Sequence, residues 1–149
     1  MNEKDKLLDL SKFELLNKIG KGAFSKVFRV KETSTGEICA AKVLQSEINE
    51  NTINSEEMIL LLREVNLMSS LNHPSILGFV GFSLYNFHQK PFPTLITKLA
   101  QNGSLRDIIN LEILGLSPQG WDSTRKLINI YGIASGLYYL HMHDIIHRD

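Results

Sequence analysis

The sequence predicts an α+β protein in which a five-stranded antiparallel sheet carries one main helix and is followed by further helices. Short runs of β-branched and aromatic residues, interleaved with charges, precede residue 44 and favour strands. Leucines at helical spacing follow from about residue 55. After Gln101-Asn102-Gly103 the pattern changes from strands to helices, so the sheet is expected to come first in the chain.

Length and composition limit the classes of function. The 149 residues suffice for one domain with a core, and 43% of them are hydrophobic. The 16 basic and 16 acidic residues cancel, so the charge gives no indication of a nucleic-acid or membrane partner. The single cysteine, Cys39, favours a reducing compartment. With neither a signal peptide nor a membrane-length apolar run in the sequence, we expect an intracellular, cytoplasmic protein.

The sheet and its helix are predicted in the first two thirds of the chain. Residues 1–12 are expected to form a polar leader, in which Leu7, Leu8 and Leu10 make a short apolar patch or a frayed helix. The predicted strands cover residues 13–19, 26–31, 37–44, 76–82 and 94–99, and the predicted helix covers residues 55–71.

Two helices are predicted in the last third. Ser104 and Asp107 form a capping-box pattern that begins a helix ending near residue 112. A longer helix over residues 123–143 carries an apolar stripe wide enough to suggest burial on more than one side. The predicted boundaries are a leader over 1–12, a sheet-bearing part over 13–97, a hinge over 98–103 and a helical part over 104–149.

A glycine-rich turn, Gly20-Lys21-Gly22, is the first candidate for chemistry. It lies between two predicted strands, whereas a dinucleotide-binding turn opens a helix, and it lacks the Gly-Lys-Ser/Thr ending of a P-loop. Glycines in such a hairpin let backbone N–H groups approach a ligand closely. The alternative is a plain hairpin with flexible turn residues.

A lysine and a glutamate form the second candidate. Ala40 and Lys42 share one face of their strand, where Ala40 leaves room for a flat ring and Lys42 can reach its anionic end. The alternative for Lys42 is an edge-strand side chain in solvent. Glu64 falls within an apolar helical stripe and needs a cationic partner, for which Lys42 is the natural candidate, unless Glu64 lies at the flank of the stripe. That stripe consists of Leu60, Leu61, Leu67, Met68 and Leu71.

Taken together, these features resemble the protein-kinase family. The glycine-rich turn, the Ala-x-Lys strand, a helical glutamate and the final His147-Arg148-Asp149 occur in the family's order, and the resemblance covers the chain from Phe13 onward. The segments 102–105, Asn-Gly-Ser-Leu, and 73–77, His-Pro-Ser-Ile-Leu, look most like the tyrosine-kinase-like group of serine/threonine kinases.

The resemblance implies roles for individual residues. Lys42 would hold the α- and β-phosphates of ATP and be fixed by Glu64, while Asp149 would be the catalytic base and Arg148 a partner of a phosphorylated activation loop. Met68, Phe79 and His147 resemble members of the family's stacked spine, and Ser25 stands where a third glycine is usual. The further residues implied to contact ATP are Ile19, Gly20, Gly22, Phe24, Val27, Ala40, Thr97, Lys98, Ala100 and Ser104.

The family's Mg²⁺ ligands, an asparagine and an Asp-Phe-Gly motif beyond the His-Arg-Asp, are not among these 149 residues. ATP and Mg²⁺ are therefore implied as cofactors, but no metal-binding residue is assigned. We expect a fragment of an ATP-dependent protein serine/threonine kinase that is inactive by itself, with a protein substrate that the sequence does not indicate. The alternative is a non-catalytic nucleotide-binding or docking module. The apolar stripe of residues 123–143 predicts self-association or a protein partner.

Overall fold

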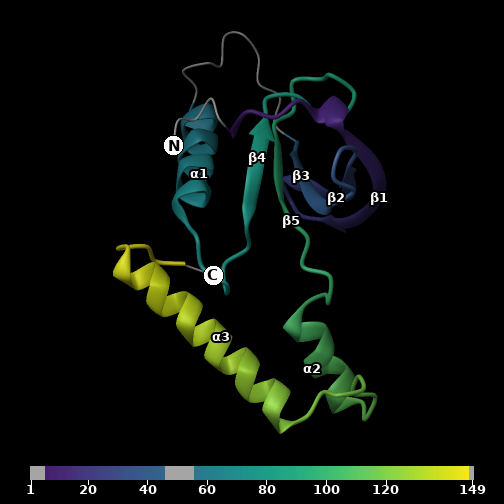
Figure 1. Ribbon diagram of the computed structural model, residues 1–149, viewed down its shortest axis with the longest axis vertical. Coiled ribbons are helices and arrows are strands. Elements are labelled where there is room, and N and C mark those ends of the chain that lie inside the picture. The colour runs from purple at the N-terminus through teal and green to yellow at the C-terminus, as the bar shows by residue number, and fades with distance from the viewer. Residues whose placement is uncertain (1–5, 46–55, 148–149) are drawn as a thin grey trace. The chain divides into compact units, whose positions relative to one another are not determined.

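A five-stranded antiparallel sheet forms the first part of the computed structural model, which describes residues 6–45 and 56–147 (Figure 1). The strand order is β1-β2-β3-β5-β4, so the predicted sheet is confirmed. The strands are β1 (Phe13–Lys21), β2 (Ser25–Glu32), β3 (Ile38–Leu44), β4 (Phe79–Ser83) and β5 (Thr94–Lys98).

The chain divides into two compact units. It passes from the first unit to the second for the last time between Leu99 and Ala100, inside the predicted hinge. The first unit holds the sheet and α1, while the second holds residues 73–77 together with α2 and α3. No helix in the described part of the chain has the length and apolar character needed to cross a membrane. The helices are α1 (Glu56–Ser70), α2 (Leu105–Ile113) and α3 (Ser123–Met142), and a 3-10 turn, η2, covers Leu10–Lys12.

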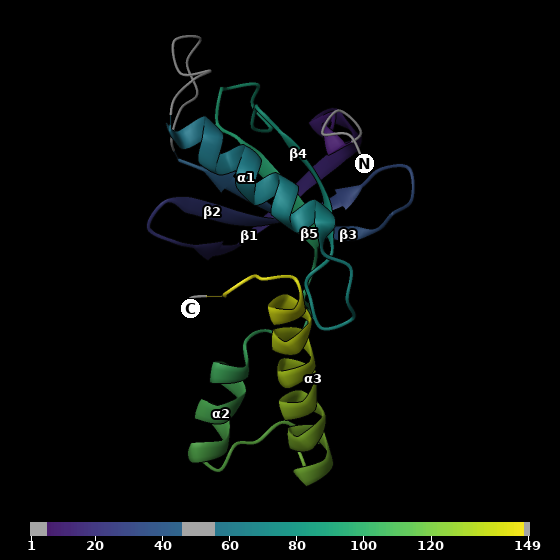
Figure 2. The same cartoon turned by 90° about the vertical axis from the view of Figure 1, so that its left-hand side faces the viewer.

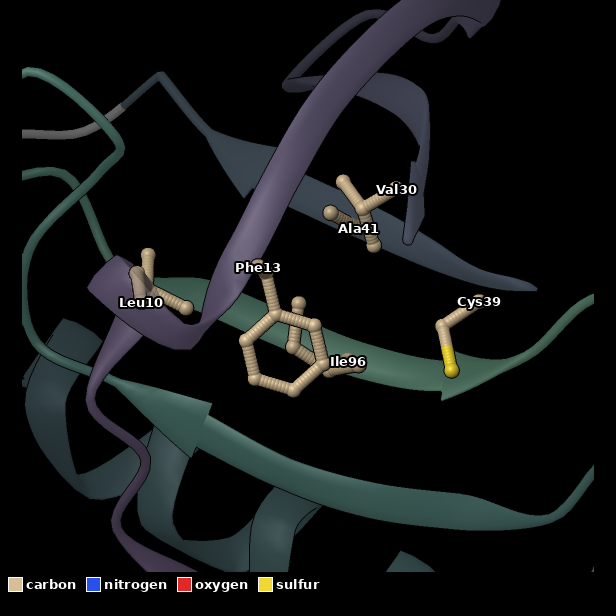
Figure 3. Close-up of a cluster of buried hydrophobic side chains, with 6 residues drawn as sticks. All are labelled: Leu10, Phe13, Val30, Cys39, Ala41 and Ile96. Carbon is tan, nitrogen blue, oxygen red and sulfur yellow. The ribbon is translucent and has the colours of Figure 1, made fainter. Parts of the chain in front are cut away.

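The alternation of side chains along β3 builds the core on one face of the sheet. Cys39 and Ala41 are 2% and 0% exposed and pack with Val30 of β2 and Ile96 of β5. Leu10 and Phe13 close the cluster from the N-terminal side (Figure 3). Burial is also the main cause that raises the pKa of the Cys39 thiol, with Glu37 and Glu32 adding to it. Cys39 is therefore a core residue.

Helix α1 covers the other face of the sheet, as Figure 2 shows. Its buried side chains are Met58, Leu61 and Val65, which pack against Phe82 and Leu95. The predicted stripe was correct at Leu61 and Met68, which belong to this cluster, and wrong at Leu60 and Leu67, which are 60% and 40% exposed. Residues 58, 61 and 65 follow the three- and four-residue spacing of one helix face, and positions 60 and 67 lie on its flank.

Residues 6–12, the described part of the predicted leader, pack on the sheet instead of fraying. The Leu8 N–H donates a 2.7 Å hydrogen bond to the carbonyl of Phe82, and Leu7 forms a parallel bridge with the same residue. The leader therefore pairs with β4, which is an edge strand of the sheet. The contact is close, because a Cβ added at Gly81 would lie 2.5 Å from the carbonyl oxygen of Lys6.

The fourth strand begins at Phe79, three residues later than predicted. The preceding residues form a turn in which the Ile76 N–H donates to the His73 carbonyl at 2.9 Å and the Ser75 N–H donates to His73 Nδ1 at 3.1 Å. These residues pack with the second unit, where a Cβ added at Gly136 of α3 would lie 3.3 Å from Ser75 Cβ. Turn hydrogen bonds thus replace the ladder that the β-favouring sequence predicted.

Helix α3 is less buried than its stripe predicted. Among its described residues only Gly136 and Leu140 are buried. Within the second unit, α3 meets the turn at residues 73–77 through Gly136, through a ring stack of Tyr139 on His73 and through a 3.3 Å hydrogen bond between Ser135 Oγ and His73 Nε2. These contacts leave most of the stripe in solvent. The exposed stripe residues are Leu127 (66%), Ile130 (64%), Ile133 (52%) and Leu137 (40%).

A carboxylate joins α2 to α3. Glu112 of α2 accepts a 3.0 Å hydrogen bond from the Trp121 indole and forms an ion pair with Lys126 of α3. The hydrogen bond from Lys126, followed by that from Trp121, holds the pKa of Glu112 below its ordinary value. Helix α2 itself begins with the predicted capping box, in which Ser104 and Asp107 each bond to the other's backbone N–H.

The burial of Leu10 makes the leader part of the folded core. We expect Leu10→Ala to lower the free energy of unfolding by about 2–5 kcal/mol, because it opens a cavity beside Phe13 and Ile96. Leu7→Ala is the matched control in the same segment, since Leu7 is 54% exposed, and it should cost well under half as much. Urea unfolding followed by far-ultraviolet circular dichroism measures both. Equal stabilities of the two variants would contradict the packing of the leader.

The Glu112 network predicts a pH effect that Trp121 can report. The pKa of Glu112 is lower in the folded state than in the unfolded state, so its contacts contribute their full stabilisation above the unfolded-state pKa. This stabilisation is lost as the pH falls through the folded-state pKa, which lies below 4.5. Trp121 is the single tryptophan, so its fluorescence should change in that pH range. Glu112→Gln should remove this change while leaving the circular dichroism at neutral pH unaltered. The same fluorescence transition in Glu112→Gln would contradict the assignment.

Candidate functional site

A cavity of about 410 Å³ opens between the glycine-rich turn, β3 and α1, all within the first unit. Strand β3 contributes Lys42 and α1 contributes Glu64, while Phe24 comes from the turn. This volume falls within the range of small-molecule pockets, about 300–1,000 Å³. The other lining residues are Ala23, Ser25, Leu44, Leu60 and Leu61.

Lys42 and Glu64 form the predicted ion pair, with Nζ 3.0 Å from Oε1. Their side chains are 42% and 41% exposed, so the predicted position of Glu64 within the buried stripe was wrong, and it lies at the flank. Ion pairs with this much solvent contribute about 0–1 kcal/mol to stability. The pair therefore positions an ammonium group in the cavity more than it stabilises the fold.

The strand register places several expected ligand-binding residues on the Lys42 face of the sheet. Val27 lies directly across from Lys42, and Ala40 lies across from Thr97. Residues directly opposite in antiparallel strands share a face, as do residues two apart in one strand. Val27, Ala40 and Thr97 thus extend the Lys42 face, with Thr97 only 9% exposed, although none of them lines the cavity itself.

The glycine-rich turn is held by one backbone hydrogen bond of its own and by one from the residue that follows β3. The Gly22 N–H donates to the Ser25 carbonyl at 2.8 Å, and the Gln45 N–H donates to the Phe24 carbonyl at 3.0 Å. Phe24 is 81% exposed and Ile19 46% exposed, so both apolar side chains extend into solvent. A large exposed aromatic ring at the mouth of a cavity is available to pack on a bound ligand.

Neither Gly20 nor Gly22 is required by the fold. Neither has a positive φ, in contrast to Gly36, whose φ is +75° in the turn before β3. A Cβ at Gly20 or Gly22 would meet only ordinary contacts, 3.5 Å to Val27 Cβ and 3.5 Å to Ser25 Oγ. Close approach of a ligand to the backbone remains a reason for glycine at both positions.

The remaining predicted residues lie elsewhere. The Lys98 N–H donates to the Gly78 carbonyl at 2.8 Å, at the end of β5. Met68 and Phe79 pack against the same buried cluster beneath α1. Ala100, Ser104 and His147 belong to the second unit, where Ser104 caps α2 and the other two are exposed. Arg148 and Asp149 lie outside the described residues.

The sequence did not predict the apolar wall of the cavity. Leu60 was predicted to lie in the buried stripe, yet it lines the cavity one helical turn before Glu64. The spacing of four residues between Leu60 and Glu64 was the feature of the sequence that could have predicted this position. Leu44 ends β3 two residues after Lys42 and shares its face. In the described part of the chain no group of three or more His, Cys, Asp and Glu side chains could hold a metal ion.

The glycines allow stability and ligand binding to be separated. Gly20→Ala and Gly22→Ala should change the free energy of unfolding by less than about 1 kcal/mol, because the added methyl groups meet no close contact. Each should weaken the binding of ATP, the ligand that the resemblance implies, by about tenfold or more, because the methyl group stands between the backbone and the phosphates.

Gly36→Ala is the matched control for these two variants. It should lose about 1–2 kcal/mol of stability, because alanine is strained at its positive φ, and it should bind ATP as the native chain does when folded. Urea unfolding and titration with a fluorescent ATP analogue measure the two effects. Unchanged nucleotide binding in both Gly20→Ala and Gly22→Ala would contradict a role of the turn in ligand binding.

Comparisons with known proteins agree on one family. A family model for the protein kinase domain matches residues 13–149. The chain is 36% identical over 146 residues to Aurora kinase of Saccharomyces cerevisiae, and the aligned region covers 98% of this chain and 36% of that protein. It is 36% identical over 132 residues to dual specificity testis-specific protein kinase 2 of Mus musculus, covering 89% of this chain and 20% of that protein.

A third relative is named for a different specificity. The chain is 32% identical over 155 residues to tyrosine-protein kinase receptor TYRO3 of Danio rerio, covering 98% of this chain and 17% of that protein. The chain thus spans at most 36% of the length of these three relatives. Because the kinase-domain model extends over the sheet, the Lys42–Glu64 pair and the helices that follow, the chain belongs to the protein kinase family.

Proposed function

We propose that this chain is part of a protein kinase domain that binds ATP and transfers its γ-phosphoryl group to serine and threonine hydroxyls of proteins. The observation that carries this proposal is the 3.0 Å pair of Lys42 and Glu64 inside the cavity beneath the glycine-rich turn. In protein kinases such a strand lysine, held by a helical glutamate, neutralises the α- and β-phosphates of ATP.

The remaining residues have proposed roles around the same ligand. Gly20 and Gly22 let the backbone of the turn come close to the phosphates, with Phe24 covering them. Asp149 accepts the proton of the substrate hydroxyl. ATP brings Mg²⁺, which neutralises charge that develops on the phosphates. The adenine and ribose are held by Ile19, Val27, Ala40, Thr97, the backbone of Lys98 and Ala100, and Ser104.

The serine/threonine specificity and the tyrosine-kinase-like group rest on short motifs. These are the Asn-Gly-Ser-Leu of residues 102–105 and the His-Pro-Ser-Ile-Leu of residues 73–77. The relatives include kinases named as dual specificity and as tyrosine-protein kinases. The buried single thiol of Cys39 supports an intracellular, reducing compartment.

A second function is supported by the exposed face of α3. Its stripe residues, among them Leu127 and Ile130, are 66% and 64% exposed. An apolar face of this kind favours association with a protein. Under this alternative the chain binds nucleotide without catalysis, and it docks on another protein or on a second copy through residues 123–143.

The function is tested by removing the Lys42 charge. Lys42→Met should weaken the binding of a fluorescent ATP analogue by about 10- to 100-fold, because a charge-assisted contact is worth about 1.5–3 kcal/mol. The fold should survive, since the exposed pair contributes about 1 kcal/mol at most. Lys31→Met is the matched control, because Lys31 is exposed on β2 and forms no ion pair with a described residue.

Transfer is measured on the same variants with γ-labelled ATP and peptides containing Ser, Thr or Tyr. The polypeptide purified from its own cells should label Ser and Thr, and Lys42→Met should abolish the label. The 149 residues produced alone should bind ATP without transfer. Labelling of Tyr alone would overturn the serine/threonine assignment. Absence of nucleotide binding in every form would overturn both the kinase and the nucleotide-binding alternative.

A further inference from the structure

A groove that the proposed function does not use opens around Lys26 and Val43, which lie on the face of the sheet opposite Lys42. Leu44, at the end of β3, lines both this groove and the candidate cavity. Two hollows, of about 240 and 190 Å³, share three lining residues, Lys26 of β2, Val43 of β3 and Asn86 of the β4–β5 connection. Because they share these walls, the hollows are neighbours, and we call them together the outer groove. All of its lining residues belong to the first unit.

Apolar side chains line both ends of the outer groove. Phe92 lines the larger hollow, while Phe87 and Phe28 line the smaller one. Phe28 and Phe87 also pack on the core cluster that contains Ile96, so this wall is anchored in the protein interior. Each hollow is smaller than the 300–1,000 Å³ typical of small-molecule pockets. Their size suits single side chains of a peptide more than a nucleotide or a cofactor.

The connection that forms one wall is held by its own hydrogen bonds. Asn86 Oδ1 accepts from the His88 N–H at 2.8 Å and from the Lys90 N–H at 3.1 Å, and the Asn86 N–H donates to the Lys90 carbonyl at 2.9 Å. A wall ordered in advance lowers the entropy that binding must offset.

The charged side chains at the outer groove are positive. Lys26 lines both hollows, and Lys21 lies directly across from it on β1. Facing like charges in a sheet are mutually destabilising. Neither lysine forms an ion pair with a carboxylate among the described residues, and neither hollow is lined by an Asp or Glu. A carboxylate bound between the two ammonium groups would relieve this repulsion.

We propose that the outer groove docks an extended acidic segment of a partner protein, which places two apolar side chains in the hollows and carboxylates beside Lys26 and Lys21. In an extended chain, side chains two residues apart point the same way at a spacing of about 7 Å, which suits two neighbouring hollows. Two lysines among apolar walls are too few for nucleic acid, where affinity comes from many phosphate contacts. The segment needs no bound ATP.

The test uses a labelled heptapeptide, Glu-Glu-Phe-Glu-Phe-Glu-Glu, titrated with the 149-residue chain and followed by fluorescence anisotropy. We expect saturable binding that weakens as salt is raised. Replacing both Phe by Ser, or all Glu by Lys, should reduce the affinity by about tenfold or more. Failure of the native chain to distinguish the Phe peptide from either replacement would overturn the proposal.

Charge reversal locates the binding site. Lys26→Glu should weaken binding of the same heptapeptide by about tenfold or more, because it puts a carboxylate in both hollows. Lys31→Glu is the matched control, since Lys31 lies on the same strand but on the opposite face. Both side chains are exposed, so both variants should fold. Equal losses in the two variants would show attraction to net charge alone and would overturn the outer groove as the site.

These outcomes are independent of the kinase assignment. Lys42→Met should leave heptapeptide binding unchanged, and Lys26→Glu should leave binding of the ATP analogue unchanged, because residues 26 and 42 lie on opposite faces of the sheet. A loss of nucleotide binding without a loss of peptide binding would therefore bear on the proposed function alone. The converse result would bear on the outer groove alone.

Discussion

The alternation of side chains along β3 is the constraint on which the rest of the first unit depends. β3 lies between β2 and β5, and each successive residue changes face. Ala40 and Lys42 face the candidate site, while Cys39 and Ala41 enter the core and Val43 lines the outer groove. A shift of register by one residue would exchange all of these environments at once and would bury the lysine. The core cluster around Ala41 thus determines where the Lys42 ammonium group lies.

Local patterns predicted the parts of the structure that depend on local geometry. The period of two along residues 37–44 placed Ala40 and Lys42 together, and the need of a carboxylate for a cation identified Glu64 as the partner. The capping box at Ser104 was also predicted correctly, because its hydrogen bonds join residues three apart. The strand alternation and the capping box need no knowledge of the tertiary packing, whereas the pairing of Lys42 with Glu64 was inferred from charge alone.

The parts that were missed depend on contacts between distant segments. Leu10 is buried because the leader pairs with β4, more than seventy residues later, and nothing in residues 1–12 indicates that partner. The phase of α1 could not be read from its leucines, because leucine occurs both on the buried face, at Leu61, and on the flank, at Leu60. The apolar wall of the cavity was missed for the same reason. The start of β4 was predicted too early, because the β-favouring residues from 76 onward gave no indication of the turn around His73.

The exposure of the Lys42–Glu64 pair has a consequence for the conformational equilibrium of α1. An ion pair worth about 1 kcal/mol or less biases a two-state population by roughly fivefold at most. The orientation of the glutamate side of the site is thus held mainly by Met58, Leu61 and Val65 on the sheet. Any ligand whose free energy of binding differs by about 1.4 kcal/mol between two positions of α1 changes their ratio tenfold. Modest differences in binding free energy can therefore change the position of α1 relative to β3, because the Lys42–Glu64 pair that joins them is partly exposed to solvent.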